Sequence, residues 1–287
     1  MLDYFVEPFQ YLFMQRALIA GLAVSVICAV LSCYMVLKRW ALMGDAISHA
    51  VLPGVVVAHL FSLPLILGAF ISGMGCALLT GYIKEHSRIK EDTIMGIVFS
   101  SMFALGLVMF AKTDSGEHLM HILFGNMLGV SEQGMWQVIV VSALVLFVVG
   151  IKFKDLLLYC FDQSHAKVSG LNVSLLHYLL LSMIALTIVA SIQIVGVILV
   201  VAMLIGPGMT ASLLSRKFEQ MVTVALLISV VSTFIGIVVS FHIDGATSAC
   251  IVLTQALLFV CTFIYSITFR NRKVTRTVIS REAAKGI

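Results

Sequence analysis

A carboxylate and an imidazole stand four residues apart at the start of a strongly apolar stretch, GDAISHAVLPGV at residues 44–55. They belong to Asp45 and His49. On an α-helix, residues four apart lie on one face, so the two side chains offer one oxygen and one nitrogen to the same ligand. Such donors suit Mn²⁺, Fe²⁺ or Zn²⁺. The absence of a Cys or Met cluster beside them argues against Cu⁺. The structural alternative is a hydrogen bond between the two residues inside a packed bundle.

The surrounding sequence has the composition of a membrane protein. Of its 287 residues 61% are hydrophobic and 11% are charged, with a mean hydropathy of +1.10, whereas about 25% charged residues is usual in soluble domains. Apolar stretches near the ~20 residues that span a bilayer recur from end to end. The sequence therefore predicts an all-α polytopic bundle, forming one domain over residues 1–287.

Hydropathy places the membrane-spanning helices that must position the pair. The predicted spans are residues 17–37, 41–61, 64–83, 93–111, 134–151, 173–191, 194–214, 220–241 and 246–268. Eight spans remain an alternative to nine, because Ser191 and Gln193 are a thin divider between two of them. Only two of the fourteen acidic residues, Asp45 and Asp244, fall inside or at the edge of a span, and the role of Asp244 stays open.

The distribution of Lys and Arg predicts the orientation, since cytoplasmic loops retain positive charge. An N-out, C-in arrangement puts sixteen of the eighteen basic residues inside, leaving only Arg16 and Lys112 outside. The aromatic-rich segment 1–16 is predicted to lie at the membrane interface. The basic tail 269–287 is predicted to lie on the cytoplasmic membrane surface, and nucleic acid is not expected as a partner.

Other residues with possible metal chemistry carry less weight. Glu117, His118 and His121 lie in an outer loop, which we interpret as a surface helix or partial re-entry that shapes the outer mouth. Direct metal binding there is the alternative. The six cysteines include no CxxC pair, so they predict neither a zinc site nor a disulfide framework and are interpreted as small apolar side chains.

Motifs spread over nearly the whole chain point to one family. The most specific is GDxxSHAxLPG at residues 44–54, and further segments are EDTIMGIVFSSMFALGL, HILFGNMLGV, FDQSHAKVSGL, VGVILVVAMLIGPGMTAS and GATSACIVL. Together they resemble the integral-membrane permeases of bacterial ABC importers for manganese, iron and zinc. The SHAVLPG form is more similar to the manganese and iron branch. The resemblance implies that Asp45 and His49 line the translocation path and bind the ion, and that two permease chains pair around it.

Two residues depart from that family pattern. In LIGPGMTAS the chain has Gly208 and Met209 where the resemblance leads us to expect small alanines. Met209 is expected to narrow or flex the helix near Pro207, so the wall of the path is less well predicted than the Asp45 and His49 pair.

The energy source must lie in another subunit, because the chain has no Gly-Lys-Ser/Thr phosphate loop. The cytoplasmic loop 152–174 is the expected docking place for an ATP-binding subunit. Its FDQSHAKVSG resembles the Asp-xxx-Ala-xxx-Gly coupling segment of the family, with Asp162, Ala166 and Gly170 in register. Asp162 is expected to cap a short helix and Gly170 to end it. An ordinary solvated loop is the alternative.

The favoured interpretation is a permease subunit in the bacterial cytoplasmic (inner) membrane. Its expected substrate is Mn²⁺ first, Fe²⁺ second and Zn²⁺ third, and it is expected to hold no permanent cofactor and to catalyse no covalent reaction. Expected partners are an ATP-binding subunit, an extracytoplasmic metal-binding protein, a second permease chain, identical or paralogous, and membrane lipid. An ion- or proton-coupled secondary carrier, in which Asp45 takes up a proton, and a purely structural assembly subunit remain alternatives.

Overall fold

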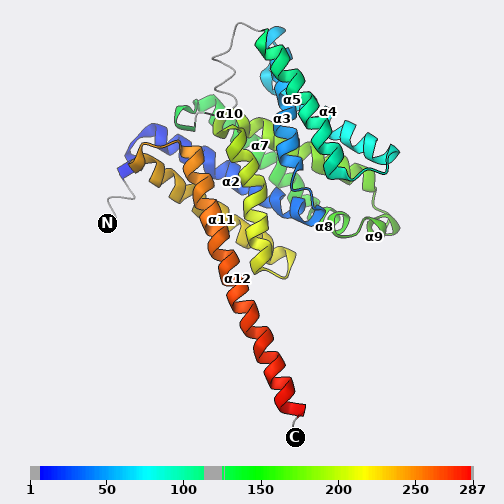
Figure 1. Cartoon of the computed structure of the whole chain (residues 1–287). Helices are drawn as coiled ribbons and strands as arrows, with labels where there is room; N and C mark the ends of the chain where they lie inside the picture. Colours follow the sequence, from blue (N-terminus) through cyan, green and yellow to red (C-terminus); the bar gives the residue numbers. More distant parts are fainter. Residues whose placement is uncertain (1–6, 113–124, 126, 286–287) are drawn as a thin grey trace.

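The computed structural model describes residues 7–112, 125 and 127–285, without the side chains of residues 85, 91, 92 and 269–285, and this part of the chain is helical (Figure 1). The elements are η1 (Glu7–Gln10), α2 (Leu12–Lys38), α3 (Met43–Leu60), α4 (Leu65–His86), α5 (Glu91–Ala111), η2 (Met127–Gly129), α7 (Glu132–Ile151), α8 (Phe153–Phe161), α9 (Gln163–Val168), α10 (Val173–Leu214), α11 (Phe218–Ile243) and α12 (Thr247–Lys285). Within the described ranges, eight helices are long and apolar enough to cross a membrane. The predicted all-α membrane bundle is confirmed, with eight candidate spans when α10 is counted as a single helix.

The longest of these helices, α10, is interrupted in its middle. Its 42 residues correspond to about 63 Å of α-helix, roughly twice the thickness of a bilayer core. Gly196 has φ 79° and ψ 165°, which no helical residue adopts, so α10 consists of two helical limbs joined by a kink. Hydropathy predicted the division at Ser191 and Gln193, a few residues too early, because the break itself is formed by an apolar glycine.

Contacts of α10 show that its two limbs run in opposite directions. Near its start, His177 contacts Tyr159 of α8 at 2.8 Å. Just after its end, the ring of Phe218 lies 5.6 Å from that of Phe153, the first residue of α8. Both ends of α10 therefore lie beside α8. The break lies beside the start of α12, where Ser248 donates a hydrogen bond to the carbonyl of Val195.

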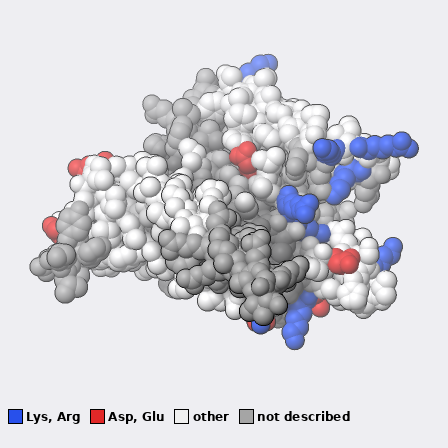
Figure 2. Space-filling view, turned by 60° about the horizontal axis from the view of Figure 1, so that its bottom comes forward, with Lys and Arg blue, Asp and Glu red and all other residues white. Residues whose placement is uncertain are grey.

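The bundle therefore has two distinct ends. One, which we name the α9 end, holds the C-terminus of α2, the helices α8 and α9, and both ends of α10. The other, the η1 end, holds η1 and the starts of α2 and α7, where Arg16 and Glu132 form an ion pair of 3.1 Å. Figure 2 shows most of the Lys and Arg side chains that it colours on one side of the molecule, in keeping with the many basic residues in segments of the α9 end. In Figure 1 the C-terminal part of α12 extends far beyond the other helices.

Small residues allow the helices that surround the candidate site to approach closely. Gly54 of α3 and Gly68 of α4 face each other, and a Cβ added at either would overlap the backbone of the other. Ser72 of α4 also donates a hydrogen bond of 2.6 Å to the carbonyl of Ala50 in α3. The two helices are thus joined along their backbones.

A second close crossing explains the unusual glycine at position 208. The backbone N–H of Gly208 donates a hydrogen bond of 2.8 Å to the hydroxyl of Ser32 in α2, and a Cβ at position 208 would lie 2.7 Å from the Ser32 carbonyl oxygen. Ser32 in turn donates to the carbonyl of Ile205 at 3.3 Å. An alanine would not fit here without moving α2. Met209, in contrast, is 39% exposed.

Candidate functional site

Asp45 and His49 lie in the first two turns of α3 and face each other. Their closest atoms, Asp45 Oδ1 and His49 Nε2, are 3.3 Å apart, and their side chains are 36% and 31% exposed. The first turn of the helix is closed by the Ala46 N–H, which donates to the Leu42 carbonyl, and the Ser48 hydroxyl bonds back to the Gly44 carbonyl at 2.7 Å. A carboxylate in the first turn of a helix is also stabilised by the helix dipole. The shared face predicted from the four-residue spacing is present.

Two aromatic rings of α5 hold the imidazole of His49. The ring of Phe99 is stacked at 6.0 Å, and that of Phe103 meets it edge-on at 4.9 Å. The Nδ1 atom of His49 is buried and has no hydrogen-bond partner among the described residues. Because the aromatic rings restrict the imidazole, its Nε2 atom stays directed at the carboxylate of Asp45.

A proline one turn further along α3 changes the backbone next to the pair. Pro53 lies inside α3, and because proline has no N–H it does not form the helical hydrogen bond to the carbonyl of His49. The carbonyl of His49 therefore lacks the helical partner that an ordinary residue at position 53 would supply. The position of Pro53 four residues after His49 is the signal of this change in the sequence.

The described part of the chain does not by itself assemble a full set of metal ligands around Asp45 and His49. No group of three or more His, Cys, Asp or Glu side chains that could hold a metal occurs among the residues that the structure describes. The cysteines do not supply a missing thiolate: four of them are buried with free thiols, and burial raises the pKa of Cys160 in α8 to about 12. Protein metal sites usually need four or more ligands, so Asp45 and His49 alone do not complete such a site among the described residues.

The predicted coupling residues form a compact helical segment at the α9 end. The Asp162 carboxylate accepts hydrogen bonds from the N–H groups of Ser164 and His165 at 2.8 and 3.0 Å, which caps α9. Ala166 is fully buried. Gly170 has φ +80° and ends the segment, with its N–H donating to the Lys167 carbonyl at 3.1 Å. The expected cap and end are both present, and the role of the segment in coupling stays a prediction.

Other predicted residues lie apart from these two regions. Glu117, His118 and His121 fall outside the described residues. Asp244 ends α11 in the left-handed region with φ 52° and is exposed. Because Asp is one of the few residues that tolerate this conformation, Asp244 has a sufficient structural explanation in the turn between α11 and α12.

Sequence reasoning missed one polar and aromatic cluster at the α9 end. The Lys38 ammonium lies 3.7 Å from the centroid of the Tyr159 ring, and the Tyr159 hydroxyl is 2.8 Å from His177 Nδ1. The Trp40 ring meets that of His177 edge-on at 5.4 Å. The cluster joins α2, α8 and α10 to the turn before α3. Its members are far apart in the sequence, so no local pattern signals it.

Comparisons with known proteins agree with this arrangement. Residues 10–266 match the model of the ABC 3 transport family. The chain is 60% identical over 260 residues to the chelated iron transport system membrane protein YfeD of Yersinia pestis, covering 91% of this chain and 88% of that protein. It is 48% identical over 259 residues to the manganese transport system membrane protein MntB of Synechocystis sp., covering 90% and 85%. A solved structure, PsaBC from Streptococcus pneumoniae in complex with Fab, has a TM-score of 0.83 and 38% identity over 92% of this chain and 95% of that chain.

Proposed function

This chain belongs to the ABC 3 transport family, and on that premise we propose how its residues move a metal ion. It is a multi-pass membrane permease of a bacterial ABC importer for iron or manganese, a transport subunit rather than an enzyme. This function leaves ATP hydrolysis to another subunit. The secondary carrier and the assembly subunit lose their support, because the family transports its substrate with ATP.

Asp45 and His49 bind the ion during its passage. The observation that carries this proposal is the 3.3 Å separation of Asp45 Oδ1 and His49 Nε2 on a half-exposed face. Two ligands at metal distances near 2.1 Å and at octahedral or tetrahedral angles are about 3.0–3.4 Å apart. Two copies of the pair, one from each of two permease chains, supply two carboxylates and two imidazoles. Such a site replaces part of the hydration shell of the ion and yet holds it only in transit.

Iron and manganese are the proposed ions, with zinc third. Oxygen and nitrogen donors accept all three, and intrinsic affinity alone favours Zn²⁺ over Mn²⁺. Selectivity therefore rests on geometry and on the protein that delivers the ion. YfeD is named for chelated iron and MntB for manganese, so we place Fe²⁺ beside Mn²⁺ rather than behind it.

The α9 end faces the cytoplasm, which gives an N-out, C-in topology. The positive-inside rule supports this orientation, because basic residues gather at the α9 end. The opposite directions of the two limbs of α10 support nine crossings, with the break at Gly196 near the outer surface. A cysteine introduced at Lys285 is then labelled by an impermeant maleimide only in opened cells. Labelling of intact cells contradicts this orientation.

The partners follow from the two ends of the bundle. An ATP-binding subunit contacts the segment from Asp162 to Gly170 at the α9 end, and an extracytoplasmic metal-binding protein docks at the η1 end. A second permease chain, identical or paralogous, completes the metal site. Segment 1–16 lies at the outer membrane interface, and the basic tail 269–287 lies along the inner one.

The decisive experiment reconstitutes the permease with its ATP-binding subunit in proteoliposomes. The metal-binding protein is supplied with Mn²⁺, Fe²⁺ or Zn²⁺, and both ATP hydrolysis and metal uptake are measured. We expect hydrolysis to be stimulated by the protein loaded with Mn²⁺ or Fe²⁺, and uptake to stop when ATP is depleted. Uptake that continues without ATP contradicts the proposed function and favours a carrier.

A further inference from the structure

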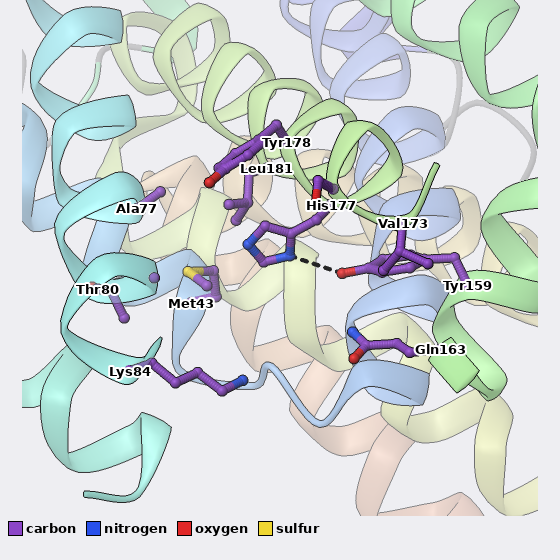
Figure 3. Close-up of a pocket in the computed structure, with 12 residues that line it drawn as sticks. Met43, Ala77, Thr80, Lys84, Tyr159, Gln163, Val173, His177, Tyr178 and Leu181 are labelled. Atoms are coloured by element: carbon purple, nitrogen blue, oxygen red, sulfur yellow. Dashed lines mark hydrogen bonds between the residues drawn. The ribbon is translucent and has the colours of Figure 1, made fainter. Parts of the chain in front are cut away.

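A cavity of about 290 Å³ opens at the α9 end, between the start of α3 and α4, α8, α9 and α10, and neither Asp45 nor His49 is among its lining residues (Figure 3). Its polar lining includes Thr80, Lys84, Gln163, Ser174, His177 and Tyr178. Figure 3 shows the Lys84 side chain reaching across the cavity toward Gln163, with the His177 ring between the helices. The cavity thus brings together hydrogen-bond donors from three separate parts of the chain.

The electrostatic character of this cavity favours an anion. Among the described side chains that line it none belongs to Asp or Glu, and Lys84 contributes a positive charge. Val173 and Ser174, the first residues of α10, also line it. The start of a long helix carries a partial positive charge and N–H groups that favour an anion. Gln163, His177 and Tyr178 can each donate a hydrogen bond.

The lining also changes from apolar to polar along the membrane normal. On α4 it passes from the buried Ala77 to the exposed Lys84, and on α10 from the buried Leu181 to the exposed Tyr178 and then to Ser174. Both helices have the length and hydropathy of membrane spans, and these are their terminal turns at the α9 end. The polar part of the cavity therefore lies at headgroup depth, and the apolar part lies deeper.

We propose that this cavity binds an anionic phospholipid of the cytoplasmic leaflet, with the headgroup phosphate at Lys84 and an acyl chain along Ala77 and Leu181. The proposal rests on the orientation given under Proposed function. Basic pockets between membrane helices on the cytoplasmic side bind such headgroups. A free phosphate ion leaves the apolar part of the cavity unused, so the lipid is the better fit.

The bound lipid also supports the coupling segment. Tyr159 of α8 and Gln163 of α9 form one wall of the cavity, and the bond between Tyr159 and His177 ties that wall to α10. An occupied cavity thus fills the space between α4 and the contact proposed for the ATP-binding subunit. This gives the complex a requirement for anionic lipid that is separate from metal binding.

Native mass spectrometry of the purified full-length chain tests the site directly. Phosphatidylglycerol and phosphatidylcholine with identical acyl chains are added, and retained lipid is counted. We expect phosphatidylglycerol to be preferred, and Lys84→Ala to weaken its binding about fivefold, with recovery in Lys84→Arg. The matched control is Lys90→Ala, an exposed lysine of the same end that does not line the cavity.

A second variant fills the cavity without disturbing the fold. Gly81 lines the cavity, and a Cβ there meets nothing within 4 Å, so Gly81→Leu is tolerated and occupies lipid space. Gly75→Leu is the control on the same helix, also with open space. We expect loss of the phosphatidylglycerol adduct only in Gly81→Leu, with both variants eluting as the wild type does in size-exclusion chromatography.

Three outcomes overturn the proposal. They are equal losses in Lys84→Ala and Lys90→Ala, competition by inorganic phosphate as strong as that by lipid, and release of the lipid when the ATP-binding subunit is added. The last outcome assigns the cavity to the protein partner. Because lipid is counted on the isolated permease, failure here is independent of the metal transport assay.

Discussion

Asp45 and His49, which we call the metal pair after their proposed role, differ from the segment of Asp162 to Gly170 in completeness. The difference is how many of the groups that each region needs are present in the described structure. The segment from Asp162 to Gly170 is complete in itself, with a side-chain cap at its start and a left-handed glycine at its end. Asp45 and His49 are each about one-third exposed, and the described residues bring no third such ligand to them. On the proposed function, the first region is already folded before its partner binds, and the second needs further ligands to bind an ion.

Substitutions in the two regions therefore have different effects. Some change the groups that can bind the ion, and others change the conformation of the backbone. At Asp45 or His49 a substitution is expected to remove a proposed ligand and to leave the fold intact. In the coupling segment and at the helix crossings a substitution alters the backbone and leaves the ligands intact. Variants of the two kinds are therefore expected to separate metal passage from coupling and from stability.

The largest effect is expected at the metal pair. Asp45→Asn keeps the size of the side chain but removes the charge that compensates the ion, and His49→Ala removes the nitrogen ligand. We expect either variant to lower metal uptake by about 100-fold or more, since even residues that only orient ligands contribute about 10–100-fold. Uptake of radioactive Mn²⁺ and Fe²⁺ into proteoliposomes measures it, with the exposed Asp244→Asn as control. Complexes that assemble and import at the wild-type rate show that the pair is structural.

A smaller and different effect is expected at the end of the coupling segment. Gly170 has φ +80°, which the ring of proline cannot adopt, so Gly170→Pro loses more than about 1 kcal/mol of local stability. We expect ATP hydrolysis to persist while metal uptake per ATP falls several-fold. Gly150→Ala is the control, since Gly150 lies within α7 with open space around it. Normal transport in Gly170→Pro places the subunit contact elsewhere.

The crossing of α3 and α4 is expected to affect stability. Gly54→Leu places a side chain where the backbone of Gly68 lies, and such overpacking costs about 1–3 kcal/mol. A lower midpoint of thermal unfolding in detergent measures the loss. Gly96→Leu, on α5 with nothing near its Cβ, is expected to unfold at the wild-type temperature. Equal midpoints for both variants contradict the close approach of the two helices.

The smallest effect is expected at Ser32. Its hydroxyl links α2 to α10 through Gly208 and Ile205, and bonds between membrane helices contribute about 0.6 kcal/mol, at most about 1.7. Ser32→Ala is therefore expected to lower the unfolding midpoint slightly. Ser212→Ala removes a bond within α10 only and is expected to change it less. A larger effect at Ser212 contradicts the importance of the crossing.

Features that depend on residues close together in the sequence could be predicted from the sequence. Asp45 and His49 share a face because of their spacing, and Asp162 and Gly170 have the residue types that begin and end a short helix. Contacts between distant segments could not be predicted. Phe103 beside His49 is one such contact.

The break at Gly196 was misplaced for a related reason. Hydropathy detects polar dividers, whereas irregular backbone buried inside a membrane protein needs no polar side chain. A glycine within a long apolar run gave no sign that its φ was positive. The position of the break becomes clear only from the structure, where the two limbs of α10 meet at Gly196.

The junction of α3 with α4 restricts how the ion can be released. Asp45 and His49 are one turn apart on a single helix, and the backbone contact of Gly54 with Gly68 ties that helix to its neighbour. The backbones of these two residues therefore keep a fixed separation as long as α3 stays helical. On the proposed pairing of two permease chains, the distance that can change is the one between the two α3–α4 pairs. We expect the parting of the two halves to act as the gate, because the affinity for the ion falls when four donors become two.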